Sequence, residues 1–162
     1  MDRSIVIKGS VVIMVALIVG SALLVQVGIP PLPVHFEEID QGFYCGLTAR
    51  VNYIIEDNDS WNTLWKDMHN ISTSTPELPY VDFTEEVVIA VFLGEFPTGG
   101  YIAEITGIMS DKGHIIITVR EQHPGENCGV TMAFTQPYHI VKASIETIQS
   151  VEFYYNLVID EC

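Results

Sequence analysis

The sequence predicts a mainly β protein with one helix (α+β): an antiparallel β-sandwich or barrel-like domain behind an N-terminal transmembrane helix. Three observations predict this class. The 162-residue chain has one long uncharged apolar segment near its start. The remainder alternates runs of β-branched and aromatic residues with turn residues, a pattern typical of strands. A single later segment has apolar residues at the spacing of one helix face.

The apolar segment runs from Gly9 to Ile29 and, as a helix, is long enough to cross one hydrocarbon core. Arg3 and Lys8 precede it and acidic residues follow it, so the positive-inside rule puts residues 1–8 in the cytoplasm. We therefore expect a transmembrane signal anchor over 9–29, in the plasma membrane. The alternative is a cleaved signal peptide and a secreted product. The length of the segment and the lack of an A-x-A-like site favour the anchor.

Residues 30–40 contain three prolines and predict a stiff spacer, which leaves 41–162 for one compact extracytoplasmic domain. The chain has 21 acidic and 7 basic residues and a formal net charge of −14. Such a charge argues against nucleic acid or an anionic lipid surface as a partner. It suits a solvated extracellular surface or a basic protein partner.

The first elements of the domain are strands and the helix. Tyr44–Asp57 is rich in β-branched and aromatic residues and predicts one or two strands. Asp59 or Ser60 then has a side chain suited to cap a helix. Four apolar residues recur at i, i+3, i+4 and i+7 of this helix, and we expect them to pack against a sheet. They are Trp61, Leu64, Trp65 and Met68.

The second half of the domain predicts strands only. Glu85–Gly94 contains a continuous apolar run of the length expected for a strand buried on both faces. Tyr101–Met109 alternates, and a turn at Asp111–Gly113 joins it to the second arm of a hairpin. Gly129–Ala143 predicts another strand, interrupted by a proline as at a sheet edge or bulge, and Ile148–Ile159 predicts the last. We expect six or seven strands, mainly antiparallel.

Three cysteines, Cys45, Cys128 and Cys162, suit an oxidising compartment with one disulfide and one spare thiol. A cysteine after the last strand is best explained as a staple for that strand. We therefore favour Cys128–Cys162 over the pairings that use Cys45, which stay open. No cysteine or histidine has the spacing of a metal site, so we expect no metal and no cofactor.

The connection Pro97–Tyr101, with the sequence PTGGY, is more elaborate than a simple turn needs. Pro97 fixes φ, while Gly99 and Gly100 permit positive φ and close approach of another backbone. Tyr101 offers an amphipathic ring of the kind enriched at binding hot spots. Two interpretations stay open: a loop that binds a partner, or a demanding turn whose tyrosine packs on the core.

A second proline–aromatic pair, Pro137–Tyr138, would lie at the same end of a sandwich, unless it only marks a bulge at a strand edge. We take the two segments together as the candidate binding loop. Its residues are Pro97, Thr98, Gly99, Gly100, Tyr101, Pro137 and Tyr138.

These segments form part of a wider pattern. Its elements are Asp82-Phe83, a buried strand that ends at Gly94, Pro97–Tyr101, Pro124-Gly125, and Thr135 with Pro137-Tyr138. As a set, over about residues 40 to 158, they resemble the C-terminal domain of the PrcB family of protease-complex subunits. The resemblance implies a non-enzymatic, exported or membrane-attached subunit that associates with a secreted protease and supports its maturation or stability.

Pro97–Tyr101 is also similar, more distantly, to a loop of the chagasin-type cysteine-protease inhibitors, which are immunoglobulin-like sandwiches. Gln136-Pro137-Tyr138 faintly matches a second inhibitory loop of that family. Phe96, Gly99 and Gln136 depart from the pattern. This likeness implies direct protease inhibition as an alternative function.

An enzyme is the remaining class. The chain lacks the GxSxG, HExxH, P-loop and Rossmann motifs, and its five histidines show no ligand spacing. His139 with nearby carboxylates is the only material for an uncharacterised active site, and a structural histidine is the favoured interpretation. We therefore expect no catalytic residue. The expected function is that of a membrane-anchored protein-binding domain, an accessory, stabilising or regulatory subunit of an exported protease.

Overall fold

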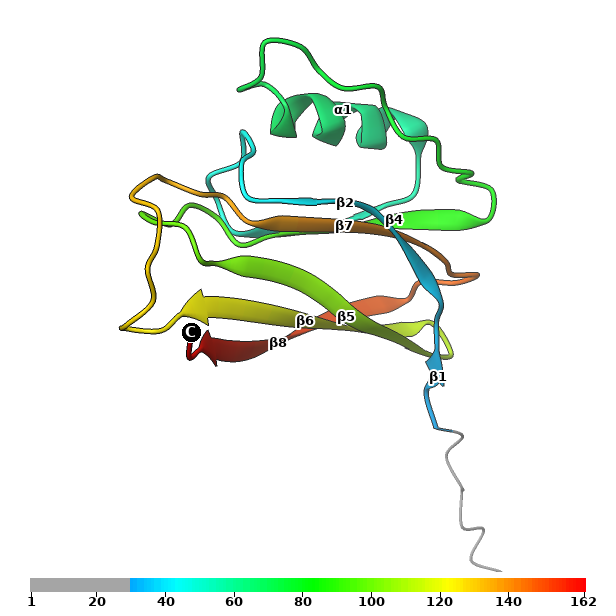
Figure 1. Cartoon of the computed structure of the whole chain (residues 1–162). Helices are drawn as coiled ribbons and strands as arrows, with labels where there is room; N and C mark the ends of the chain where they lie inside the picture. Colours follow the sequence, from blue (N-terminus) through cyan, green and yellow to red (C-terminus); the bar gives the residue numbers. More distant parts are fainter. Residues whose placement is uncertain (1–29) are drawn as a thin grey trace, which may run out of the picture.

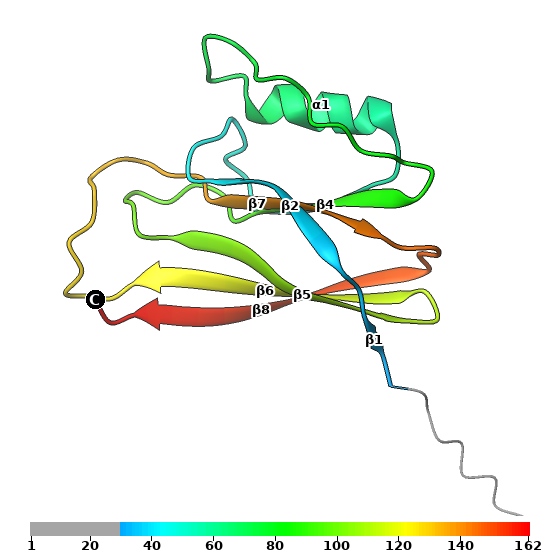
Figure 2. The ribbon, with the colours of Figure 1, turned by 45° about the vertical axis from the view of Figure 1, so that its right-hand side comes forward.

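The computed structural model describes residues 30–162, which form two β-sheets and one helix in three layers (Figure 1). The outer sheet has the strand order β1-β5-β6-β8, and the middle sheet has the order β2-β7-β4-β3. Figure 2 shows the helix α1 lying on the face of the middle sheet that points away from the outer sheet. This arrangement is a β-sandwich with a helix packed on one side, as the fold class predicts.

The elements have the following bounds. The outer sheet contains β1 (Leu32–Pro33), β5 (Ile102–Asp111), β6 (His114–Pro124) and β8 (Ser150–Asp160). The middle sheet contains β2 (Phe36–Gly42), β7 (Tyr138–Ser144), β4 (Glu86–Phe92) and β3 (Val51–Ile55). The helix α1 spans Asn58–Met68.

Strand β4 is buried on both faces, which confirms the prediction for this apolar run. Val88, Ala90 and Phe92 pack with α1 in one core cluster. The alternate residues, Val87 and Ile89 among them, pack against the outer sheet in a second cluster. Because successive side chains of a strand point to opposite faces, a strand between two apolar layers needs an unbroken apolar sequence.

Helix α1 begins earlier than predicted. Its N-cap is Asp57, whose carboxylate accepts hydrogen bonds from the Ser60 backbone N–H at 2.8 Å and from the Ser60 hydroxyl at 2.7 Å. Asp59 and Ser60, the predicted caps, lie inside the first turn, because Asp57 is the residue that keeps an extended backbone. The predicted apolar face is confirmed. Its buried residues are Trp61, Leu64, Trp65 and Met68.

The strands differ from the prediction in number and in one direction. Residues 30–162 form eight strands, because residues 30–40, predicted as a spacer, contribute β1 and most of β2. Residues 129–137, predicted as a strand, form a loop instead, and β7 starts only at Tyr138. Strand β8 runs parallel to β6, because the chain crosses from the middle sheet to the outer sheet between β7 and β8. The other named pairs are antiparallel.

Polar side chains join the two sheets along one open side of the sandwich. The Tyr155 hydroxyl of β8 donates to the Asn52 side-chain oxygen of β3 at 2.7 Å. Arg50, just before β3, binds both carboxylate oxygens of Glu121 on β6, at 2.9 and 2.6 Å. Burial alone would raise the pKa of Glu121, but hydrogen bonds from Arg50 and His123 outweigh it and lower the pKa.

The transmembrane anchor predicted over 9–29, and the cytoplasmic residues 1–8, lie outside the described residues. Residues 30–162 contain no helix with the length and apolarity needed to cross a membrane.

Removal of the Trp61 side chain should destabilise the fold strongly. Trp61 is fully buried, and its indole N–H donates to the Pro79 carbonyl at 3.0 Å. We expect Trp61→Ala to lower the free energy of unfolding by about 3–5 kcal/mol. Urea denaturation followed by circular dichroism measures this. Lys66→Ala, on the exposed face of the same helix, is the control and should change the value by less than about 0.5 kcal/mol. Equal midpoints for the two variants would contradict the packing.

Candidate functional site

Three connections gather at one end of the sandwich, near the C-terminal end of β8 (Figure 1). They are residues 43–50, 93–101 and 125–137, and we call this region the loop end. The backbone N–H of Glu95 donates to the Thr48 carbonyl at 3.0 Å, which joins the first two connections. The opposite end of the sandwich holds β1 and the turn between β5 and β6.

The second and third connections are paired along their length. Phe96 and Thr135 exchange two backbone hydrogen bonds, of 2.8 and 2.9 Å. The Thr135 hydroxyl also donates to the Thr98 carbonyl at 2.7 Å, and the Gly99 N–H donates to the Thr131 carbonyl at 2.9 Å. The structure therefore brings the PTGGY loop and the segment before Tyr138 together.

The glycines of the PTGGY loop make this pairing possible. A Cβ at Gly99 would collide with the Thr131 hydroxyl. Gly100 has a φ of 93°, which side chains with a Cβ rarely adopt, and a Cβ there would lie 2.9 Å from Pro124. Both glycines thus serve the approach of the two loops.

Tyr101 packs on the domain and does not project from it. Its ring stacks on Phe96 with a centroid distance of 3.9 Å and meets the His123 ring edge-on at 4.9 Å. Of the two interpretations of this tyrosine, the packed one describes its position. At the tip of the loop, Pro97 and Gly100 are exposed, while Thr98 is half-buried.

Pro137 and Tyr138 lie beneath the loop end and are buried. The Tyr138 ring stacks on Phe92, and its hydroxyl donates to the Asp40 carboxylate at 2.9 Å. Burial, together with the nearby Asp40 carboxylate, raises the pKa of Tyr138 well above its usual range. These two residues support the loops from below and offer no surface to a partner.

The exposed apolar side chains of the loop end were not predicted from the sequence. Met132 and Phe134 project from the third connection with exposed fractions of 87% and 64%. Phe43 and Tyr44, on the first connection, are also exposed. We call these four residues the apolar rim. Tyr44, Met132 and Phe134 stood in segments predicted as strands, because runs of apolar residues are common to a strand and to a loop with apolar side chains.

Two residues of the apolar rim, Phe43 and Tyr44, line a shallow cleft with a volume of about 310 Å³. Gly99, Gly100 and Thr131 also line it. Backbone of the PTGGY loop is therefore open to a partner in this cleft, although its tyrosine is not. A cleft of this kind fits a protruding side chain of another protein.

A disulfide between Cys128 and Cys162 ties the third connection to the residues that follow β8, which confirms the favoured pairing. Asp160 lies beside these two sulfurs, but sulfurs bonded to each other are not a thiolate pair for a metal. Cys45 is free and buried, and burial raises the pKa of its thiol, so the reactive thiolate is disfavoured.

His139 links the two sheets and lies in the core, with 3% of its surface exposed. Its Nδ1 accepts a hydrogen bond from the backbone N–H of Ile105 at 2.7 Å. The proton therefore sits on Nε2, which lies 3.1 Å from the Glu38 carboxylate. Burial lowers the pKa of His139, although the nearby carboxylates act in the opposite direction. Both ring nitrogens are occupied, as expected of a structural histidine.

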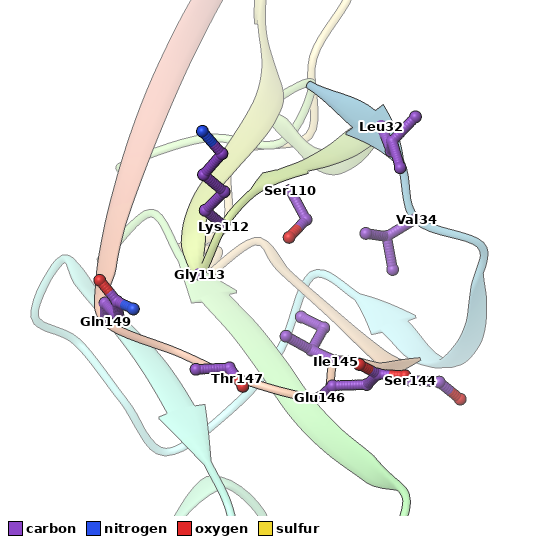
Figure 3. A pocket seen from close by; sticks show the side chains of 10 residues that line it. All are labelled: Leu32, Val34, Ser110, Lys112, Gly113, Ser144, Ile145, Glu146, Thr147 and Gln149. Atoms are coloured by element: carbon purple, nitrogen blue, oxygen red, sulfur yellow. The ribbon is translucent and has the colours of Figure 1, made fainter. Parts of the chain in front are cut away.

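A larger hollow, of about 590 Å³, lies at the opposite end of the sandwich. It is formed by β1, the turn between β5 and β6 and the connection from β7 to β8 (Figure 3). Figure 3 shows the Lys112 side chain extending away from Val34 and Ile145. The lining has no histidine, cysteine or aromatic residue, so this hollow lacks the usual groups of a catalytic pair or a protein anchor.

Residues 87–144 match the family model described as PrcB C-terminal. These residues, which we call the PrcB C-terminal segment, are similar to that family. The PrcB C-terminal segment contains all but the first residue of β4, the hairpin β5–β6 and β7, and with them the second and third connections of the loop end. No curated protein and no solved structure matches the chain. The likeness of one loop to chagasin-type inhibitors stays a prediction.

The buried His139 should make the fold sensitive to acid. Because its pKa is lowered in the folded state, the unfolded chain binds this proton more readily, at its ordinary pKa of about 6.5. Stability is therefore complete above that pH and falls as the pH is lowered through it. We expect His139→Gln, which cannot titrate, to show a smaller loss of unfolding free energy between about pH 7 and 5. Denaturation at each pH measures the free energy of unfolding. The same dependence of this free energy on pH in the wild type and the variant would refute the role of His139.

Loss of the disulfide should destabilise the whole domain. The cysteines are separated by 34 positions, so the bond restricts the unfolded chain by about 3–4 kcal/mol. We expect the double substitution Cys128→Ser and Cys162→Ser to lower the free energy of unfolding by about 3–4 kcal/mol. A reducing agent should produce the same change in the wild type and none in the double variant. A stability loss in the double variant on reduction would show that another bond is involved.

Proposed function

We propose that the protein is a non-enzymatic binding subunit that attaches to an exported protease, or to a related envelope protein, through its loop end. The observation that supports this most strongly is the apolar rim beside the cleft. Aromatic residues and methionine are enriched at the centres of protein interfaces, and a group of them in contact with water marks a binding surface. Two of the four, Met132 and Phe134, lie within the PrcB C-terminal segment.

The family supports a protease complex as the setting. The sequence resembles the protease-complex subunits of the PrcB family, and the matching segment supplies two of the three connections at the loop end. We infer an accessory role, in which the subunit stabilises or regulates a protease partner. We also expect the partner to have a basic surface, because a chain with a net charge of −14 attracts positive charge.

The position of β1, at the end of the sandwich opposite to the loop end, suits a protein anchored in a membrane. The described chain enters at β1, at the end of the sandwich opposite to the loop end, as both views show (Figures 1 and 2). If Gly9–Ile29 is a membrane anchor, the loop end points away from the bilayer. We propose this location, at the outer side of the plasma membrane, in preference to a secreted form.

Two other functions have less support. An enzyme would need an accessible base or nucleophile, whereas His139 is buried with both nitrogens engaged and the Cys45 thiol is buried with a raised pKa. Direct inhibition would use the tip of the PTGGY loop, whose Pro97 and Gly100 are exposed although Tyr101 is packed away. Incubation of the purified protein with papain-like proteases separates inhibition from simple attachment.

Truncation of the apolar rim should abolish attachment to the partner. We expect Met132→Ala with Phe134→Ala to weaken binding by about tenfold or more, as for central interface residues. Mild crosslinking, purification and mass spectrometry of the partners measure this. The control is Tyr80→Ala, which removes another exposed aromatic residue outside the loop end.

The pattern of captured proteins decides between the outcomes. Attachment predicts a protease among the partners of the wild type and of the control, and its loss from the double variant. The same partners at the same yield in all three would exclude the apolar rim as the binding surface.

A further inference from the structure

Strand β8 forms a free edge of the outer sheet. It pairs with β6 on one side, and no strand in residues 30–162 pairs with its other side. It spans 11 residues, the same length as β6 and longer than the other six strands. Every second backbone N–H and C=O along it therefore faces outward. A row of unpaired groups of this length is a template for another strand.

The other sheet edges are blunted in ways that prevent such pairing. Strand β1 has two residues, one of them Pro33, and β3 has five. Strand β2 contains a bulge between Glu38 and Asp40, and its Gln41 side chain donates to the Ala103 carbonyl of β5 at 2.7 Å. Short length, proline, bulges and covering side chains are the usual protections of edge strands.

Strand β8 has none of these protections. Its register with β6 is continuous from Ser150 to Asp160, and it contains no proline, glycine, lysine or arginine. Four large apolar side chains on it are exposed to 40% or more. They are Tyr154, Leu157, Val158 and Ile159. A long, regular and apolar edge would cause aggregation unless it had an occupant.

We propose that the β8 edge binds an extended, basic segment of a partner protein, which adds to the outer sheet as a further strand. Backbone hydrogen bonds would supply the affinity and the exposed apolar side chains the selectivity. The charge of the occupant follows from the charges at the edge. Glu152 and Asp160 lie on β8 and Glu161 follows it, and the strand has no cation of its own.

A second copy of the chain fits this edge less well. Two copies that paired along β8 would bring together two chains that each have a net charge of −14, and these repel one another. A partner strand that contains lysine or arginine would instead be attracted by Glu152, Asp160 and Glu161.

This inference does not rest on the apolar rim, and the test keeps the two surfaces apart. The probe is a short fluorescent peptide of alternating valine and threonine with lysine at each end. It is added to the full chain in a mild detergent, and binding is followed by fluorescence anisotropy. Hydrogen exchange then locates the site. We expect exchange to slow in residues 150–160 and to stay unchanged in α1.

Two controls test the strand geometry. A probe with N-methyl groups on alternate amides keeps its charge and side chains but lacks the donors for pairing, and should bind about tenfold more weakly or worse. Val158→Lys should weaken binding of the original probe to a similar degree. Asn62→Lys, which makes the same charge change on α1, should leave binding nearly unchanged. The Met132→Ala and Phe134→Ala variant should bind the probe normally.

Three results would overturn the proposal. The first is equal binding of the N-methylated probe. The second is the absence of slowed exchange in 150–160 at a saturating concentration of the probe. The third is a dimer of the chain in sedimentation that Val158→Lys dissociates, since this would make a second copy the occupant.

Discussion

The middle sheet packs against an apolar layer on each of its two faces, and the rest of the structure depends on this two-sided burial. Its central strands, β4 and β7, pack against α1 on one face and against the outer sheet on the other. Helix α1 and the outer sheet do not share a core cluster, so each packs separately against the middle sheet. A one-residue change in the register of β4 would exchange the side chains on its two faces. The two-sided burial therefore fixes the ends of the strands, and with them the places from which the three connections of the loop end leave.

Polar side-chain contacts join the two sheets where apolar packing does not. On one side of the sandwich His139 and Gln41 bind backbone groups of β5, and on the other Tyr155 and Arg50 cross between the sheets. These contacts pair backbone groups of β5, the charge of Glu121, and the polar side chains of Tyr155 and Asn52. The β8 edge differs because its outward groups have no such partner within residues 30–162.

The strands and the helix with a strong local sequence pattern could be predicted from the sequence. Which side chains are exposed at the loop end could not. The unbroken apolar run of β4 and the helical spacing of Trp61 and Trp65 each have one physical explanation, and both predictions are confirmed. Met132 and Phe134 alternate as strand residues do, but the chain there pairs with the PTGGY loop and leaves them in water. This depends on contacts between distant segments, such as Phe96 with Thr135, which no local pattern contains. The same reason explains why Tyr101 and Tyr138, chosen as binding residues, are packed into the fold.

The disulfide has a consequence for the order in which the molecule is completed. Cys162 follows β8, and β8 is the last strand to join the outer sheet along the chain. The third connection, which presents Met132 and Phe134, therefore gains its covalent tether only when β8 lies beside β6 and the two sulfurs are oxidised. Without that bond its hydrogen bonds to the PTGGY loop still hold it. Oxidation thus adds a covalent link between these exposed side chains and the last strand of the domain.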